Sequence, residues 1–138
     1  MTIITTSPLQ TKKIARELAK KIINNKNKKA FIIGLEGDLG SGKTTFIQGL
    51  AKELGIKQKI TSPTFVIFKK YLNFYHIDCY RLNNSQDLIE LGFKEMLNNS
   101  KNIIAIEWAS KVKKILPQNT LWLKFEHKGE DKREIIIN

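Results

Sequence analysis

The chain has 138 residues and a formal net charge of +11, because its 24 lysine and arginine residues outnumber its 13 aspartate and glutamate residues. This length suits one domain with its own core, so we expect residues 1–138 to form a single domain. The single cysteine, Cys79, excludes an internal disulfide. No apolar run of about 18 residues and no signal-peptide pattern occurs, so we expect a cytoplasmic protein outside the membrane.

The positive charge comes almost wholly from lysine. A surface this basic attracts nucleotides and RNA at long range, whereas we expect no DNA ligand. The plainer interpretation is that the lysines are solvated on helix faces, and contact with RNA stays open beside it.

The first predicted element is a helix that begins at Ser7 and Pro8. The serine hydroxyl can cap the helix, proline suits the first helical position, and Gln10 stands three residues after the cap. Apolar residues then recur every three or four positions as far as Ile23, which predicts one buried face. After a polar connection, residues 30–36 form a short apolar run that is typical of a buried strand.

Residues 37–44, Gly-Asp-Leu-Gly-Ser-Gly-Lys-Thr, match the phosphate-binding pattern G-x-x-x-x-G-K-[ST] at every fixed position. Its glycines, which let main-chain N–H groups approach phosphate oxygens, are Gly37, Gly40 and Gly42. The helix predicted over residues 44–54 would point its positive end at the same anion. Lys43 adds a full charge near the outer phosphates, and Thr44 offers a hydroxyl to Mg²⁺. The order of strand, loop and helix therefore predicts a nucleoside triphosphate site rather than an ordinary glycine turn.

Two strands are predicted next, over residues 64–68 and 74–78, from their β-branched and aromatic content. A tight connection at residues 71–73 should join them as a hairpin, which adds an antiparallel element to a parallel sheet. Thr64 lies in the loop where nucleotide switches keep a hydroxyl that senses the γ-phosphate and Mg²⁺. By itself, however, this loop is also an ordinary turn.

A helix capped by Ser85 should extend to Met96, with Gly92 weakening its middle. Residues 102–107 form the second continuous apolar strand. A short helix over residues 109–115 follows, and residues 120–125 and 133–137 alternate as a C-terminal hairpin. These elements predict an α/β fold of the P-loop NTPase type, in which helices flank a mostly parallel sheet with added antiparallel hairpins.

Two acidic residues end predicted strands, where open α/β sheets bind their ligands. Glu107 ends an apolar run, as does the carboxylate that stands beside Mg²⁺ in P-loop proteins, but it could equally cap a neighbouring helix. Asp78 could hold a metal-bound or attacking water, or form a salt bridge with Arg81 or a lysine. His76 is more typical of a packed or surface residue than of a catalyst. Trp108 is more typical of a core or partner contact than of base stacking.

Taken together, four motifs carry a family resemblance: residues 37–45, 62–65, 76–82 and 106–108. Their order and spacing resemble the TsaE family of small P-loop ATPases, which are needed to make threonylcarbamoyladenosine in tRNA. The resemblance implies ATP and Mg²⁺ as cofactors, with Thr44 and Glu107 at the metal positions and Asp78 as a catalytic acid. The ATP-binding residues that it implies are Gly37, Gly40, Ser41, Gly42, Lys43, Thr44 and Thr45.

The same resemblance implies TsaD and TsaB as partners and a tRNA reached through their complex. TsaE itself does not transfer the threonylcarbamoyl group, and its ATP cycle acts on the complex. Ser41 stands where the family more often has alanine, and the C-terminal hairpin is short. We expect residues 8–11 and the turn near Gly129 to form the walls around adenine.

The predicted reaction is attack of water on the γ-phosphate, with Lys43 stabilising charge and Asp78 or Glu107 positioning the water. Arg81 is the only arginine expected near the site, as a phosphate or partner contact, so hydrolysis should be slow without a partner. A small-molecule kinase is an alternative, although the chain has no insertion for an Arg-rich lid. A basic RNA-binding module is another, although the signatures of the common RNA folds are missing.

Overall fold

The structure is a computed structural model, and it describes residues 1–24, 28–38, 40–61 and 67–138. The elements fall into two compact units. The first unit contains β1 (Thr2–Thr5), α1 (Pro8–Ile23), α2 (Lys43–Glu53), β6 (Leu121–His127) from Trp122 onward, and β7 (Arg133–Ile137). The second contains β2 (Phe31–Glu36) as far as Leu35, β3 (Phe68–Tyr71), β4 (Phe74–Asp78), α3 (Ser85–Glu90), α4 (Phe93–Leu97), β5 (Ile103–Glu107) and the 3₁₀ helix η1 (Ala109–Ile115).

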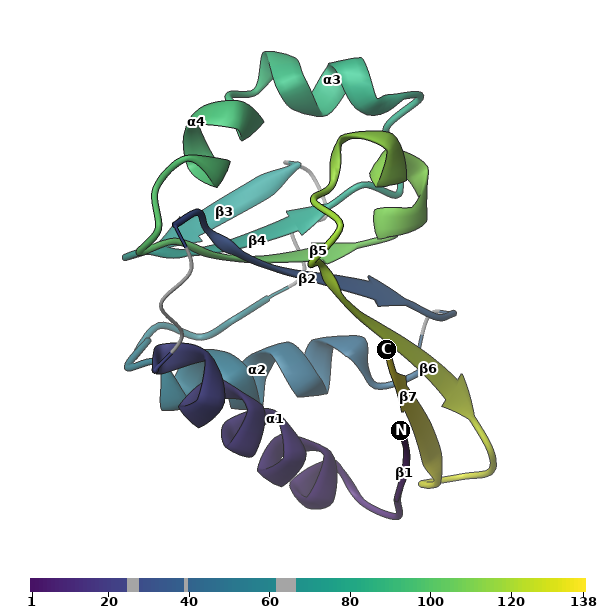
Figure 1. Cartoon of the computed structure of the whole chain (residues 1–138). Helices are drawn as coiled ribbons and strands as arrows, with labels where there is room; N and C mark the ends of the chain where they lie inside the picture. The colour runs from purple at the N-terminus through teal and green to yellow at the C-terminus, as the bar shows by residue number, and fades with distance from the viewer. Residues whose placement is uncertain (25–27, 39, 62–66) are drawn as a thin grey trace. The chain divides into compact units, whose positions relative to one another are not determined.

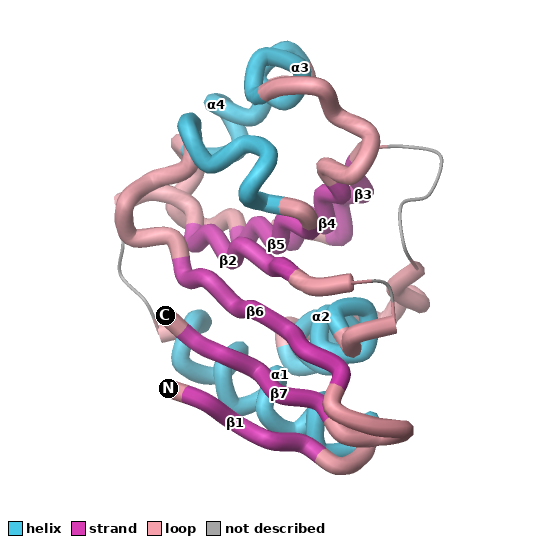
Figure 2. The backbone as a smooth tube through the Cα atoms, turned by 90° about the vertical axis from the view of Figure 1, so that its right-hand side faces the viewer, coloured by secondary structure: helices cyan, strands magenta, loops and turns pink. Residues whose placement is uncertain are grey.

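In the first unit, β7 lies between β1 and β6 and is antiparallel to both, as Figure 2 shows. Helices α1 and α2 lie side by side (Figure 1) and bury small and apolar residues such as Ala15, Ala19 and Leu50. Phe46 of α2 packs edge-on against Phe125 of β6, with ring centroids 5.4 Å apart. This packing fixes the start of α2 against the C-terminal hairpin.

The predicted start of α1 is confirmed. The main-chain N–H of Gln10 donates to Ser7 Oγ at 3.2 Å, so the serine caps the helix. The Gln10 side chain reaches back and accepts the main-chain N–H of Thr6 at 2.7 Å. The first bond satisfies a donor that the first turn of a helix otherwise leaves without a partner, and the second holds the residue that precedes the cap.

In the second unit, β5 pairs in parallel with β2 and with β4, and β3 pairs antiparallel with β4. All five residues of β5 are buried, because a central parallel strand is covered on both faces. Helices α3 and α4 lie over one face of this sheet (Figure 1). The predicted α/β class, with a parallel core and antiparallel hairpins, is therefore confirmed.

Several element bounds differ from the predictions. The strand expected over residues 64–68 is described only from Phe68 and continues to Tyr71, because Lys69 and Lys70 hide the strand pattern. Leu72, at φ 57°, makes the two-residue turn of the predicted hairpin. Residues 64–66, and so Thr64, lie outside the described residues.

The helix expected over residues 85–96 is two helices. Gly92 adopts φ 93° and separates α3 from α4, so the glycine ends a helix rather than weakening one. Asn84, not Ser85, caps α3, since its side chain accepts the N–H of Asp87 at 3.2 Å. The strand β1 was not predicted, because it shows no alternation and gains its partners from β7. Within the described residues, no helix is long and apolar enough to cross a membrane.

Candidate functional site

The glycine-rich loop joins the end of β2 at Glu36 to the start of α2 at Lys43. Its three glycines all have left-handed backbone angles, with φ of 141° at Gly37, 77° at Gly40 and 105° at Gly42. Residues with side chains rarely adopt such angles, so glycine is needed at each of these positions. Leu39, in the same loop, lies outside the described residues.

Gly37 also meets a space constraint. A Cβ atom there would lie 2.6 Å from the carbonyl oxygen of Phe125 and 2.9 Å from Oγ of Ser41. Both distances are shorter than real Cβ contacts, so β6 could not pass this close to any other residue. The C-terminal hairpin is therefore part of what shapes the loop.

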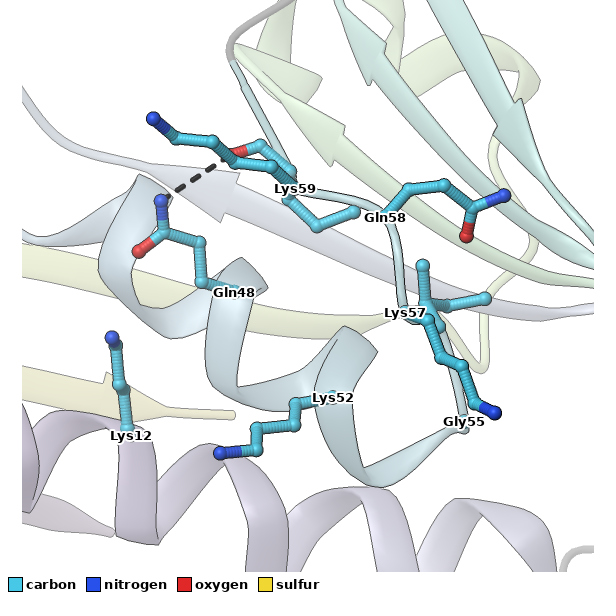
Figure 3. A pocket seen from close by; sticks show the side chains of 9 residues that line it. Lys12, Gln48, Lys52, Gly55, Lys57, Gln58 and Lys59 are labelled. Atoms are coloured by element: carbon cyan, nitrogen blue, oxygen red, sulfur yellow. Dashed lines mark hydrogen bonds between the residues drawn. The ribbon is translucent and has the colours of Figure 1, made fainter.

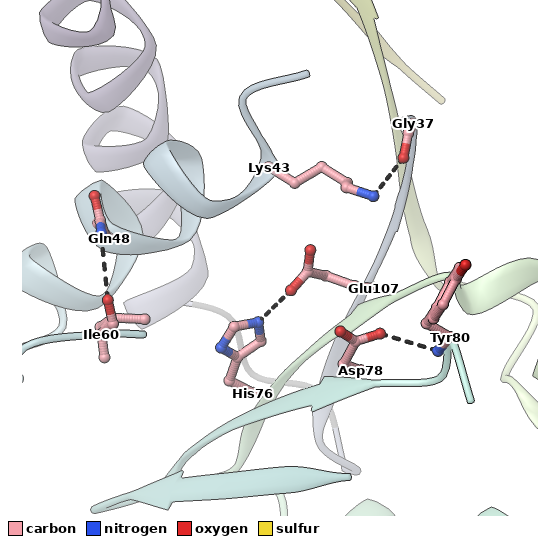
Figure 4. Close-up of polar contacts among 8 residues, drawn as sticks. All are labelled: Gly37, Lys43, Gln48, Ile60, His76, Asp78, Tyr80 and Glu107. Atoms are coloured by element: carbon pink, nitrogen blue, oxygen red, sulfur yellow. Dashed lines mark hydrogen bonds and ion pairs between the residues drawn. The ribbon is translucent and has the colours of Figure 1, made fainter. Parts of the chain in front are cut away.

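Lys43, the first residue of α2, is only 4% exposed, and its side chain crosses the loop to donate to the carbonyl oxygen of Gly37 (Figure 4). Ser41 is buried as well, and its Oγ has no hydrogen-bond partner among the described residues. Thr44 and Thr45 follow in the first turn and are half-buried. The loop thus gathers an ammonium group, hydroxyl groups and the N-terminus of α2, which together suit an anion with several oxygen atoms.

Arg133 is a contact that sequence reasoning missed. The stem of this β7 residue covers Gly42, with Cγ 3.6 Å from where a Cβ atom of Gly42 would lie. The guanidinium group donates to the carbonyl oxygens of Glu130 at 3.3 Å and of Gly129 at 3.4 Å. The expectation that Arg81 is the only arginine near the site is therefore wrong. Arginine is rare in this lysine-rich chain, and this rarity was the feature of the sequence that could have drawn attention to Arg133.

Asp78 and Glu107 stand opposite each other in the parallel pair of β4 and β5, each as the last residue of its strand. On the other side of β5, Glu107 is paired with Leu35 of β2. The two acids are therefore neighbours at the carboxyl ends of the strands, as predicted. Oδ1 of Asp78 accepts the N–H of Tyr80 at 2.9 Å, which orients the half-buried carboxylate (Figure 4).

Glu107 forms a buried pair with His76. Its Oε2 lies 2.7 Å from Nε2 of the imidazole, and the two side chains are 7% and 0% exposed (Figure 4). Nδ1 of His76 has no partner among the described residues. The 3₁₀ helix η1, which follows β5, begins after Trp108 without a side-chain cap, and the alternative role of Glu107 as a cap of a neighbouring helix stays a prediction.

We predicted that His76 is a packed or surface residue rather than a catalyst, and its fully buried side chain is that of a packed residue. The sequence did not predict its pairing with Glu107, because the two residues lie 31 positions apart in the chain.

Beyond Glu107, Trp108 adopts φ 56° and packs its ring against Tyr80, with centroids 5.2 Å apart. Positive φ is uncommon for a bulky residue and clusters at functional positions. Tyr80 is 54% exposed, and the Lys111 side chain donates to its carbonyl oxygen. The neighbouring Arg81 is exposed. The expected partner contact of Trp108 and Arg81 stays a prediction.

The fold and the loop define a mixed α/β protein in which a glycine-rich loop connects a parallel strand to a helix. The model of the family described as "Threonylcarbamoyl adenosine biosynthesis protein TsaE" matches residues 5–135. The chain belongs to the TsaE family, which confirms the resemblance seen in its motifs.

The similarity extends over most of the chain. A tRNA threonylcarbamoyladenosine biosynthesis protein TsaE from Bacillus subtilis (strain 168) is 38% identical over 135 residues, covering 95% of this chain and 80% of the relative. The protein of that name from Treponema pallidum (strain Nichols) is 37% identical over 109 residues, or 77% of this chain and 80% of the relative. A crystal structure of Bacillus subtilis YdiB has a TM-score of 0.77 and 34% identity, covering 98% of this chain and 82% of the other.

Proposed function

We propose that this protein is a Mg²⁺-dependent ATPase that acts in the synthesis of tRNA threonylcarbamoyladenosine together with TsaD and TsaB. The observation that carries the proposal is the loop itself, in which three left-handed glycines precede α2 and the buried Lys43 side chain crosses to Gly37. Membership of the TsaE family, which the matched residues 5–135 establish, supports the tRNA pathway.

The loop residues would hold the phosphates of ATP. The main-chain N–H groups of the glycine segment and the Ser41 hydroxyl donate to phosphate oxygens. The buried hydroxyl, which has no hydrogen-bond partner among the described residues, would gain one in this way. Lys43 exchanges the Gly37 carbonyl for an oxygen of the outer phosphates and so keeps a charged donor beside the transferred group. Arg133 closes over Gly42 at the same loop.

The oxygen donors of Thr44 and Glu107 fit Mg²⁺, which prefers carboxylate, hydroxyl and phosphate oxygens. An ion held by these residues would supply positive charge that stabilises the negative charge developing on the phosphates in the transition state. His76 holds Glu107 in a single orientation through its 2.7 Å hydrogen bond. Asp78, whose carboxylate is fixed by Tyr80, orients the water that attacks the γ-phosphorus while the bond to the β-phosphate oxygen breaks.

The test is ATP hydrolysis in the presence of TsaD and TsaB. The variants Lys43→Ala and Glu107→Gln should each lower the rate by roughly 100-fold or more, since each removes a group that stabilises transition-state charge. Lys20→Ala is the matched control, because it removes the same charge from an exposed position of α1 and should leave the rate unchanged.

Hydrolysis by either variant at the wild-type rate contradicts the proposal. With γ-labelled ATP the label should appear as free phosphate, and label on a small acceptor would indicate a kinase instead. Circular dichroism spectra should match the wild type, so that a lost rate reports the site rather than the fold.

A further inference from the structure

The first unit contains a hollow with a volume of about 690 Å³, which the proposed ATPase reaction does not use. It lies among α1, α2 and the segment that follows α2 (Figure 3). Four lysines line it: Lys12 from α1, Lys52 from α2, and Lys57 and Lys59 from the following segment. Buried Ile56 and Ile60 complete the wall, at 6% and 4% exposure.

The charge of this lysine pocket is unbalanced. No acidic residue lines the pocket, and within the described ranges none of its four lysines forms an ion pair. Like charges gathered in one hollow repel each other and raise the local potential for anions. An anion that enters the pocket would reduce this electrostatic repulsion among the lysines.

The lysine pocket is also held in place by its backbone. Gly49 allows α2 to approach α1 closely, since a Cβ atom there would lie 2.8 Å from Cα of Lys12. The N–H of Ile56 donates to the carbonyl oxygen of Ala51 at 3.0 Å, and the Gln48 side chain donates to that of Ile60 at 3.2 Å (Figure 3). These contacts anchor both ends of the segment that carries Lys57 and Lys59.

The lining indicates which anion fits. It contains no aromatic ring on which a base could stack, and its cations are lysines, which act as mobile point charges rather than as a fixed guanidinium fork. Such a surface suits successive phosphates of a backbone and carries no means of reading sequence. We propose that the lysine pocket binds the phosphate backbone of RNA. The choice of tRNA as this RNA rests on the proposed function in tRNA threonylcarbamoyladenosine synthesis.

The experiment measures binding of an unmodified tRNA transcript to the full chain by fluorescence anisotropy at several salt concentrations. In the pocket variant, Lys12, Lys52, Lys57 and Lys59 are all changed to Gln. The slope of log affinity against log salt should fall by about 3, since each phosphate contact contributes roughly 0.7 to 0.9. At one salt concentration near 0.1 M the affinity should fall roughly tenfold or more.

The matched control variant changes four exposed lysines elsewhere, Lys20, Lys21, Lys94 and Lys114, to Gln. It loses the same net charge but leaves the lysine pocket intact. It should therefore keep most of the slope and most of the affinity for tRNA. If both variants weaken equally, tRNA senses only the total charge and the lysine pocket is not a site. A variant with only Lys57→Gln and Lys59→Gln should show about half of the decrease in slope. Because it carries fewer changes, it keeps the test valid if the fourfold variant does not fold.

Two further measurements identify the ligand of the lysine pocket and distinguish this proposal from the ATPase proposal. If the pocket variant loses binding to poly-glutamate but not to tRNA, an acidic protein surface is the ligand and the RNA proposal is overturned. The Lys43→Ala variant should bind tRNA as the wild type does. Loss of tRNA binding in that variant would show that the nucleotide loop, not the lysine pocket, makes the contact.

Discussion

The pair formed by His76 and Glu107 is the closest polar contact between the buried side chains at the strand ends, at 2.7 Å. Changing His76 to Leu removes a donor from a buried carboxylate and should lower the free energy of unfolding by roughly 1.5 to 3 kcal/mol. Urea unfolding followed by circular dichroism measures this loss.

The control is a double-mutant cycle with Glu107→Gln. Because the two side chains interact directly, the effects of the single variants should not add in the double variant. If the double variant loses the sum of the two single losses, the pair is not coupled and the orienting role given to His76 is wrong.

Arg133 makes a separate prediction, since its stem covers Gly42 and its guanidinium group is tied to the turn before β7. Arg133→Ala should weaken ATP binding roughly tenfold, because a charged donor beside the phosphate loop is lost. Titration with a fluorescent ATP analogue measures the dissociation constant. Lys132→Ala removes the same charge from the exposed neighbouring position and should leave binding unchanged.

At the scale of elements, Gly49 decides how closely α1 and α2 pack. Alanine usually stabilises a helix relative to glycine by about 1 kcal/mol, but here its Cβ atom would lie 2.8 Å from Cα of Lys12 and 2.9 Å from the Lys12 carbonyl oxygen. Gly49→Ala should therefore destabilise the protein by roughly 1 to 3 kcal/mol, the usual cost of overpacking. A rise in thermal stability would show that the helices can separate without loss.

The β6–β7 hairpin carries a cluster of exposed charges that predicts a pH dependence. The hydrogen bond and charge of Lys128, 3.0 Å away, hold the pKa of Glu126 below its ordinary value of 4.5. The carboxylate therefore stabilises the fold above pH 4.5, and this contribution disappears as the pH falls through the lower folded pKa. Lys128 shows the opposite sign, since the hydrogen bond that it donates to Glu126 raises its pKa, and its contribution disappears only in strongly alkaline solution.

We expect the melting temperature of wild type to exceed that of Glu126→Gln slightly at pH 7, and this difference to shrink as the pH falls below 4.5 and through the lower folded pKa of Glu126. The effect should be small, because the pair is exposed and screened by salt. A difference that grows in acid would contradict the assigned sign.

Most elements could be predicted because their signals are local. The cap of α1 and the glycine loop each depend on residues within one turn of the chain, and both were found from the sequence. The division of α3 from α4 was missed because Gly92 can weaken a helix or end it, and packing of Phe93 and Met96 decides between them. The strand β1 was missed because its partner lies at the other end of the chain.

The same distinction between local signals and contacts of distant residues applies to the candidate site. The loop residues and the two strand-end acids follow from motif and strand order, which the sequence displays directly. Arg133 and His76 could not be derived in this way, since their roles come from contacts with residues far away in the chain. Sequence reasoning found the residues that we propose to meet ATP better than the contacts that hold these residues in place.

At the scale of the whole chain, the proposal depends first on the glycine-rich loop of the first unit and on Lys43. The central claim is that the loop binds ATP with Mg²⁺, and titration calorimetry with Mg²⁺ and a non-hydrolysable ATP analogue tests it most directly. Wild type and Lys20→Ala should bind alike, Lys43→Ala should bind at least tenfold more weakly, and Glu107→Gln should lose the dependence on Mg²⁺. Equal affinity of wild type and Lys43→Ala would contradict the account.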